Sequence, residues 1–419
     1  MLPWVVWIVA AVFFFFNYMN QVVPSAMAGP LIKAFHIDAA MLGTIAAVYF
    51  YIYAVMQIPV GVLVDHFGPH RSLGCAAVLA AAGCLLFSFA STVDMAIVTR
   101  MMIGAGASFS FIATLKLIAN WFPANRFGTM TGLTNVVGML GAIVGVGLLT
   151  NLTLIMGWRQ TILLLGVVGG ILAGLIFFLV RDYPAAASPQ PQHQTKRERI
   201  GKMLHDLRQI FSTGQNWVNG LYAATINAPY IALGALWGTK YLQTAYLLDK
   251  PDAALLSSMI FVGAIPGSFF FGWFSDRIKR RKLPMIVGAA GGLAAISLQL
   301  YVPDVSLVAS YILFFLLGFF CSGNVVAYAL AHDLCPPKLV GVAVGFVSTF
   351  LYGVGALFDP LIGWLLSKHV VHGAAHDASI YTRDDFSFAL SSLVACLAVT
   401  LITSLLIRET RCRSRDAVD

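Results

Sequence analysis

The stretch Gly61-Val62-Leu63-Val64-Asp65-His66-Phe67-Gly68 decides the fold, because Gly272-Trp273-Phe274-Ser275-Asp276-Arg277 repeats its pattern 211 positions later. Three more positions repeat at nearly the same distance: Pro123, Gly128 and Gly132 return as Pro336, Gly341 and Gly345. A chain of 419 residues that repeats at about half its length consists of two fused halves. Two membrane halves of this kind indicate alternating access rather than a fixed pore or a soluble enzyme.

The composition is that of a membrane protein. Hydrophobic residues make up 59% of the chain and charged residues 11%, whereas a soluble domain has roughly 45–50% and about 25%. The segment 161–180 carries no charge, and a helix of that length crosses about 30 Å of hydrocarbon. Because a helix satisfies its own backbone groups in lipid, we predict an all-α membrane protein.

We predict twelve membrane-spanning helices in two pseudo-symmetric six-helix bundles, residues 1–180 and 217–407. A cytoplasmic linker, 181–216, joins the bundles, and a tail, 408–419, follows them. The predicted spans are 4–30, 40–63, 72–91, 94–119, 128–150, 161–180, 217–244, 254–274, 283–302, 305–331, 339–366 and 387–407. We do not interpret the first span as a cleavable signal, because no basic residue precedes it.

Lys and Arg placement predicts the orientation. Most of these residues fall in the segments that are cytoplasmic if both termini are inside, as in 196–202 and 277–282. The basic loops then face the anionic inner leaflet of a bacterial inner (plasma) membrane, which explains the net charge of +8 without nucleic acid. The six scattered cysteines form no metal-ligand spacing, and no phosphate-binding loop is present. We therefore expect no metal, no cofactor and a gradient as the energy source.

Two motifs make the chain resemble the major facilitator superfamily (MFS) over its whole length. The first is Gly61-x-x-x-Asp65-x-x-Gly68-x-x-Arg71, with a degenerate copy at Gly272, Asp276 and Arg277; the second is Arg100-x-x-x-Gly104-x-Gly106 in span 4. The resemblance implies that the first motif forms the loop between spans 2 and 3, with Asp65 beside the start of span 11. That contact would hold the inner side closed. The alternative is turn geometry and surface charge alone.

The chain departs from the MFS pattern at His66, Pro69 and His70, where basic residues are usual, and span 5 lacks the Gly-Pro pair of drug/proton antiporters. A narrower resemblance links Ala119–Pro123 and the tail segment Ile407–Cys412 to the phagosomal nutrient transporters of intracellular bacteria. It implies uptake of amino acids or nucleosides.

Two charged residues inside spans are candidates for coupling or solute binding. Asp359 is the acidic residue that falls well inside a span, and it either carries a proton or solute contact or satisfies the backbone freed by Pro360. Arg100 suits a solute carboxylate, resembles the MFS arginine linked to proton coupling, or extends to the outer surface. A salt bridge between the two is a further hypothesis. For Lys116, we expect its side chain to extend to the cytoplasm.

Polar residues form stripes along several predicted spans. These are Asn17, Asn20 and Gln21 in span 1; Tyr49 and Tyr53 in span 2; Asn219, Tyr222, Tyr230 and Trp237 in span 7; Asn324, Tyr328 and His332 in span 10; and Ser348, Tyr352 and Asp359 in span 11. Spans 1, 4, 7 and 10 line the cavity in the MFS, so the resemblance implies one polar site. The alternative is hydrogen bonding between helices.

The sequence therefore predicts a secondary active transporter that imports a small polar metabolite (an amino acid, nucleoside or organic acid) with protons. We expect that the protein is not an enzyme, because no nucleophile or pair of carboxylates falls within the spans. We also expect a monomer. An exporter of amphipathic compounds and a non-transporting membrane sensor on the same fold remain as alternatives.

Overall fold

The computed structural model describes residues 2–37, 39–184, 205, 207–303, 305–369 and 382–412, and these residues form helices and their connections. Packing divides the chain into two compact units. Unit 1 comprises Met1–Ser212 and Cys335–Thr349, and unit 2 comprises Thr213–Leu334 and Phe350–Asp419. The segment Cys335–Thr349 thus packs with unit 1, although the sequence predicted it in the second bundle.

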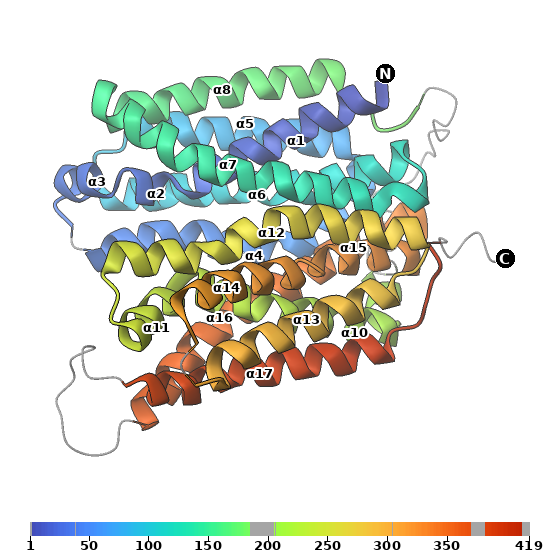
Figure 1. Cartoon of the computed structure of the whole chain (residues 1–419). Helices are drawn as coiled ribbons and strands as arrows, with labels where there is room; N and C mark the ends of the chain where they lie inside the picture. Colours follow the sequence, from blue (N-terminus) through green and yellow to red (C-terminus); the bar gives the residue numbers. More distant parts are fainter. Residues whose placement is uncertain are drawn as a thin grey trace. The chain divides into compact units, whose positions relative to one another are not determined.

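Unit 1 is built from helices that lie side by side (Figure 1). They are α1 (Leu2–Gln21), α2 (Val23–Ala26), α3 (Ala28–Phe35), α4 (Ala39–Phe67), α5 (Pro69–Ser88), α6 (Val93–Trp121), η1 (Ala124–Arg126), α7 (Phe127–Met156), α8 (Trp158–Leu179), η4 (Pro337–Leu339) and the first part of α16 (Val340–His369). Helix α5 packs against α6 and α8, α4 against α6, and α1 against α7. Helix α6 is therefore the centre of the unit.

Unit 2 has its own helical core. Its elements are α10 (Gly214–Ile231), the π-helix η3 (Ala232–Leu236), α11 (Trp237–Tyr246), α12 (Lys250–Ile278), α13 (Lys282–Tyr301), α14 (Leu307–Cys321), α15 (Asn324–Leu334), the second part of α16 and α17 (Arg383–Leu406). Helix α14 packs against α12 and α13, and α17 packs against α13 and α10.

Ten helical segments among the described residues are long and apolar enough to cross a membrane. They are Leu2–Gln21, Thr44–Phe67, Pro69–Ser88, Val93–Trp121, Ala124–Met156, Trp158–Leu179, Asp252–Ile278, Lys282–Tyr301, Leu307–Leu334 and Arg383–Leu406. The other two predicted spans, 217–244 and 339–366, coincide with α10 to α11 and with α16. The predicted all-α membrane class is confirmed.

Three predicted spans are not single helices. Span 4–30 is divided into α1, α2 and α3, with Pro24 in the first turn of α2. Span 217–244 contains a π-helical segment after Pro229. Span 305–331 breaks between α14 and α15, where the Ser322 hydroxyl donates to the Ala264 and Gly318 carbonyls. Proline removes a backbone donor, and the serine hydroxyl satisfies a carbonyl at the break, so hydropathy alone did not reveal these interruptions.

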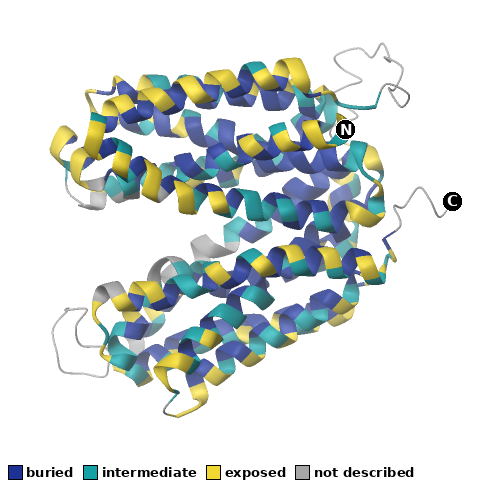
Figure 2. Cartoon of the chain, turned by 45° about the horizontal axis from the view of Figure 1, so that its top comes forward, coloured by how far each residue is buried: buried dark blue, intermediate teal, exposed yellow. Residues whose placement is uncertain are grey.

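Large apolar side chains cover the outer faces of the helices, as the exposed positions in Figure 2 show. Phe178 is 85% exposed, Leu154 79% and Val55 72%. In water such surfaces promote association, whereas in a bilayer they contact acyl chains. The exposed faces therefore indicate that the surrounding solvent is lipid.

Helices α12 and α14 approach closely through a reciprocal pair of glycines. A Cβ added at Gly263 would clash with the Phe315 carbonyl oxygen, and one at Gly318 would clash with the Ile260 carbonyl oxygen. Both obstacles are backbone atoms, so no side chain can rotate away.

We expect Gly318→Ala to lower the melting temperature of the purified protein, because separating two packed helices costs on the order of 1–3 kcal/mol. Gly170→Ala in α8 is the matched control, since a Cβ there meets no atom within 4 Å. Equal melting temperatures for Gly318→Ala and the unsubstituted protein would contradict this packing.

Candidate functional site

The first motif is mostly helical, so its prediction as a loop is wrong. Residues up to Phe67 belong to α4, and Gly68 alone separates it from α5. Gly68 has a φ of 83°, which glycine adopts without strain, and Pro69 occupies the first turn of α5. This tight reversal places Asp65 in the last turn of α4.

The Asp65 carboxylate is buried, with 2% of its side chain exposed, and it is fully bonded. Its Oδ1 accepts from Lys116 Nζ at 2.5 Å and from the Gly341 N–H at 3.0 Å. Its Oδ2 accepts from the Val342 N–H at 2.8 Å. The last two donors belong to the first turn of α16, whose unpaired N–H groups and partial positive charge favour a carboxylate. Asp65 therefore ties α4, α6 and α16 together.

Repeated glycines let α16 come this close. A Cβ at Gly61 would clash with the Gly341 carbonyl oxygen, and one at Gly341 would lie 2.7 Å from the Gly61 oxygen. One at Gly345 would clash with the Gln57 carbonyl. The glycines that revealed the repeat in the sequence are thus those at which α4 and α16 cross.

Lys116 does not extend to the cytoplasm, so that prediction is wrong. Its side chain is 3% exposed. Its Nζ donates to Asp65 and, at 2.7 Å, to the Pro337 carbonyl. Ion pairing with Asp65 of another helix replaces contact with water, and no pattern along the chain indicates that this acid lies within reach. Lys116 is a functional candidate that sequence reasoning missed.

Arg71 and Arg277, the basic members of the two motifs, are both exposed. Asp182, near Arg71, accepts from the His70 N–H at 2.6 Å at the start of α5. Burial raises the pKa of Asp182, although the His70 and Arg71 interactions oppose that rise. Among the described residues, the charge of Arg71 therefore lies near Asp182, and Arg71 does not bridge to other helices.

In unit 2 the motif copy uses a different base from the predicted Arg277. Gly272 and Asp276 are buried on α12, and Asp276 Oδ1 accepts from Arg281 Nη1 at 2.6 Å. Arg281 is 0% exposed, and its Nε donates to Asp333 Oδ2 at 2.8 Å. Helix α12 ends at Ile278, and the next residue, Lys279, has a φ of 52° that reverses the chain and brings position 281 back toward α12. Arg277 points away from this contact into solvent.

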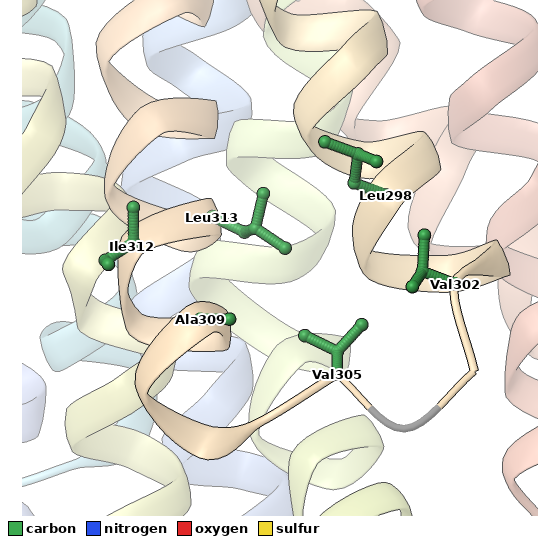
Figure 3. A pocket seen from close by; sticks show the side chains of 6 residues that line it. All are labelled: Leu298, Val302, Val305, Ala309, Ile312 and Leu313. Atoms are coloured by element: carbon green, nitrogen blue, oxygen red, sulfur yellow. The ribbon is translucent and has the colours of Figure 1, made fainter.

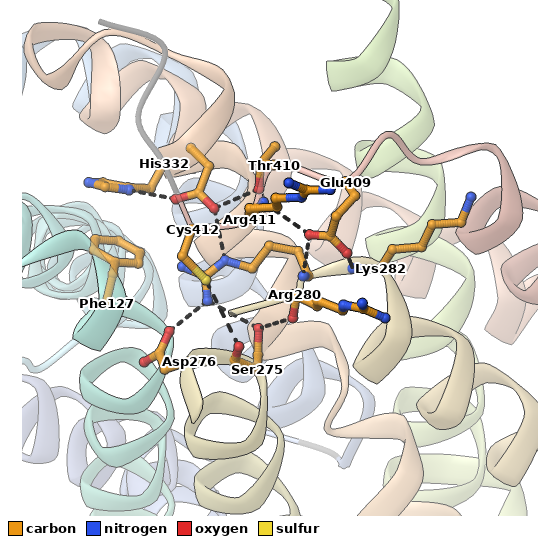
Figure 4. Close-up of polar contacts among 12 residues, drawn as sticks. Phe127, Ser275, Asp276, Arg280, Lys282, His332, Glu409, Thr410, Arg411 and Cys412 are labelled. Atoms are coloured by element: carbon orange, nitrogen blue, oxygen red, sulfur yellow. Dashed lines mark hydrogen bonds and ion pairs between the residues drawn. The ribbon is translucent and has the colours of Figure 1, made fainter. Parts of the chain in front are cut away.

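His332 and Asp333 on α15 complete this ionic cluster, part of which Figure 4 shows. His332 Nδ1 lies 3.2 Å from Asp333 Oδ1. Burial by itself would lower the pKa of Arg281, but the charges of Asp333 and Asp276 outweigh it and raise that pKa. His332 therefore belongs to an ionic cluster at the end of α15.

Arg100 on α6 is the most unusual side chain of unit 1. It is 0% exposed, so the alternative that it extends to the outer surface is wrong. Its Nη1 donates to the Asn20 carbonyl at 2.9 Å, and its guanidinium lies 5.0 Å from the Tyr49 ring centroid. Among the described residues, its Nε and Nη2 have no hydrogen-bond partner. A buried guanidinium thus keeps one edge of its donor fork free.

Several predicted polar residues gather around Arg100. Asn17 is 2% exposed, and neither of its amide atoms has a partner, while its carbonyl accepts from Tyr49 Oη at 3.3 Å. The Asn20 side chain is held in place: its Nδ2 donates to Phe16 O and its Oδ1 accepts from Cys84. Next to this group, Tyr53 is buried and stacks on Tyr49, and Gln21 is half-buried. Gln57, which sequence reasoning missed, lies further along α4, and its buried Oε1 has no partner among the described residues.

The polar residues of unit 2 have mixed surroundings. Asn219 Nδ2 donates to the Ala327 carbonyl at 2.8 Å, and its Oδ1 is unpaired. Asn324 Nδ2 lies 3.5 Å from Asn227 Oδ1, and its own Oδ1 is unpaired. Tyr328 is buried and Tyr352 is half-buried. The ring of Tyr230 packs on Phe261, and the Lys240 ammonium lies over the ring of Trp237.

Two predicted site residues do not enter the candidate site. Tyr222 is 0% exposed, and its hydroxyl donates to the Met285 and Gly323 carbonyls at 3.3 and 3.4 Å. Its polar atom is therefore used between helices of unit 2. Asp359 belongs to α16, but its side chain lies outside the described part of the structure, as does any pairing with Arg100.

A hollow between α13 and α14 is not suited to a polar solute. Its lining consists of aliphatic side chains that converge in Figure 3: Leu298, Val302, Val305, Ala309, Ile312 and Leu313. None of them offers a side-chain hydrogen-bond partner, so the hollow suits an apolar group.

We expect Asp65→Asn to destabilise the protein by roughly 3 kcal/mol, because it leaves the buried Lys116 ammonium without a counter-charge. Lys116→Met should cost less when it is added to Asp65→Asn than when it is made alone. The free energy of unfolding of the single and double variants measures this coupling. Lys338→Met, at an exposed lysine, is the control. Additive losses would show that the two side chains are not coupled.

Comparison with known proteins identifies the family. The family model described as "Major Facilitator Superfamily" matches residues 7–358 and 224–415. The chain is 26% identical over 378 residues to the probable sulfoacetate transporter SauU of Cupriavidus necator, covering 86% of each protein. It is 23% identical over 387 residues to the membrane sensor protein UhpC of Escherichia coli, covering 87% of this chain and 84% of that one.

Solved structures show the same fold. The fucose:proton symporter FucP of Escherichia coli aligns with a TM-score of 0.73 at 16% identity, covering 96% of this chain and 97% of that chain. The fold matches the predicted twelve-helix MFS architecture, and the resemblance to the MFS is confirmed. This multi-pass membrane protein is not an enzyme; it belongs to the Major Facilitator Superfamily of transporters.

Proposed function

We propose that this protein imports a small organic anion together with protons by alternating access. The observation that carries the proposal is the buried Arg100, whose Nε and Nη2 have no partner. Among the described residues no carboxylate pairs with this guanidinium: its electrostatic neighbours are Tyr49 and Cys84. A solute with a carboxylate or sulfonate group supplies the missing charge.

The geometry of the free donors favours an oxyanion over a neutral solute. A buried charge without a partner is costly, so binding an anion here offsets a cost that the empty protein already bears. The unpaired Nε and Nη2 form one edge of the guanidinium fork, which matches the two oxygens of a carboxylate. Nη1 is already used by the Asn20 carbonyl, and this bond fixes the orientation of the fork.

An unpaired amide extends the proposed site beyond the anionic group. Among the described residues, the Asn17 side chain has a free donor and a free acceptor. These atoms suit the hydroxyl groups of a small polar organic acid. Of the three solute classes predicted from the sequence, we therefore favour organic acids over nucleosides and amino acids. The similarity to a probable sulfoacetate transporter supports the same choice.

In the proposed cycle, the Asp65 contact with Lys116 and the start of α16 keeps the inner side closed. Opening requires that these bonds exchange for water, and the glycine crossing of α4 and α16 then separates. Asp359, inside a predicted span, remains the proposed proton carrier, and likeness to a fucose:proton symporter supports proton coupling. We place the termini in the cytoplasm and the protein in the inner membrane, as a monomer.

The test is uptake of labelled sugar acids, sulfonates, amino acids and nucleosides into proteoliposomes under an inward proton gradient. We expect organic anions to accumulate, and a protonophore to abolish the accumulation. Arg100→Lys should weaken solute binding about 10-fold, because an ammonium cannot present the same fork. Arg100→Gln should weaken it about 100-fold.

Arg159→Gln is the matched control for these variants. Arg159 is an exposed arginine of the same unit that stacks on Trp158 and donates to the Ser88 carbonyl. Its loss should leave solute affinity unchanged. Uptake of neutral solutes only, or equal anion affinity in Arg100→Gln, would refute the anion proposal. Efflux without uptake would instead support the exporter alternative.

A membrane sensor is the second candidate function, because the chain is similar to the sensor UhpC over most of its length. A sensor binds its ligand without moving it across the membrane. Saturable binding of an organic anion to the purified protein, with no uptake under any gradient, would favour this candidate.

A further inference from the structure

The segment after α17 lies across the helix ends of unit 2. Before the segment begins, Lys282 Nζ donates to the Leu405 carbonyl and Gln215 Nε2 to the Leu406 carbonyl. The Arg408 N–H donates back to Gln215 Oε1 at 2.9 Å. The last turn of α17 is thus joined to α10 and α13, and it directs residues 409–412 onto the ionic cluster around Arg281.

Glu409 supplies the cap that α13 lacks. Arg281 is the N-cap residue of α13, and its side chain forms no capping hydrogen bond with this helix. Instead, Glu409 Oε1 accepts from the Arg281 N–H at 2.7 Å, and Oε2 accepts from the Lys282 N–H at 3.1 Å. A carboxylate at a helix N-terminus satisfies free donors and interacts favourably with the helix dipole. The tail therefore binds the backbone N–H of Arg281, whose side chain pairs with both Asp276 and Asp333.

Thr410 and Cys412 bind the other side of the same cluster, as Figure 4 shows. The Thr410 hydroxyl donates at 2.8 Å to Asp333 Oδ2, the oxygen that also accepts from Arg281 Nε. Cys412 is 7% exposed, and its Sγ lies 3.9 Å from the Ser275 carbonyl oxygen. Glu409, Thr410 and Cys412 thus bind the ends of three helices, α13, α15 and α12 respectively.

The bound tail is strained. Arg411 and Cys412 have φ values of 55° and 57°, in the left-handed region that is unfavourable for a residue with a Cβ. The anchors of the tail are mainly polar bonds at the end of the unit, and the net contribution of each such bond to stability is modest. A segment with this balance of strain and polar bonds is able to open locally while the helices stay folded.

We infer that residues 409–412 form a releasable latch, in which Glu409 and Thr410 position Arg281 and Asp333, and that its release accompanies opening of the inner end of unit 2. The latch function rests on the proposed transport cycle. The docking of the latch does not, because it follows from contacts within unit 2 alone.

Cys412 reports on docking without any solute. Burial raises the pKa of its thiol to about 12, so the docked thiol is protonated at neutral pH and reacts slowly. We would treat the purified full-length protein in nanodiscs with a maleimide and quantify modification of Cys412 by peptide mass spectrometry. We expect the folded protein to react at least ~10-fold more slowly than the protein unfolded in detergent.

Variants test the positioning roles. Glu409→Gln and Thr410→Val should each accelerate Cys412 modification about 10-fold, whereas Thr410→Ser, which keeps the hydroxyl, should not. Arg411→Gly should slow modification about 5-fold, because glycine adopts the left-handed conformation without strain. Arg411→Gln is its control, since the Arg411 side chain is exposed and glutamine keeps the strain.

Transport separates a latch from a static tail. Once a solute is identified, Glu409→Gln should raise the maximal rate and Arg411→Gly should lower it, both with an unchanged half-saturating concentration. Fast modification of Cys412 in the unsubstituted protein would overturn the docking. Changed modification with unchanged maximal rates would overturn the latch. Failure of organic anions to be transported would refute the proposed solute and leave the labelling result standing.

Discussion

The Asp65 carboxylate organises unit 1, because it is buried and still receives three hydrogen bonds from two different helices. A buried carboxylate is tolerated only when its oxygens are paired, so the positions of Lys116 and the first turn of α16 follow from this one group. The contact also explains the glycines, since only residues without a side chain let α4 and α16 cross closely enough for the bonds to form. A charge of this kind is a natural place for a conformational change, because breaking the contact exposes groups that water can solvate.

The described part of unit 1 contains two buried cations, Arg100 and Lys116, whose charges are stabilised in different ways. Lys116 is neutralised by an acid of the protein, and this pairing makes it a structural element. Arg100 is held by one carbonyl and an aromatic ring, and two of its donor nitrogens remain unpaired. An unpaired buried charge lowers stability. In the proposed function, binding of a negatively charged solute offsets this loss. This contrast is the physical basis for assigning recognition to Arg100 and closure to Lys116.

Unit 2 uses the repeated motif in a different way. Its acid, Asp276, pairs with Arg281 at the start of α13, and Asp333 on α15 pairs with the same guanidinium. The chain then returns after α17 and adds Glu409 and Thr410 to this cluster. The two halves therefore share a pattern of sequence, whereas the acid of each motif copy is held by different chemistry.

The sequence by itself determined the all-α membrane class, the approximate spans, the family and the positions of Asp65, Gly61 and Gly341, because hydropathy, repeats and motifs are local patterns in the chain. It also singled out Arg100 as a charge inside a span. Only the tertiary structure decided the partners. Lys116 pairs with an acid 51 positions away, Arg281 replaces Arg277 because the chain reverses at Lys279, and Tyr222 is used between helices. The partners of a buried polar group depend on which helices are neighbours and how they rotate, and no local pattern along one helix records that.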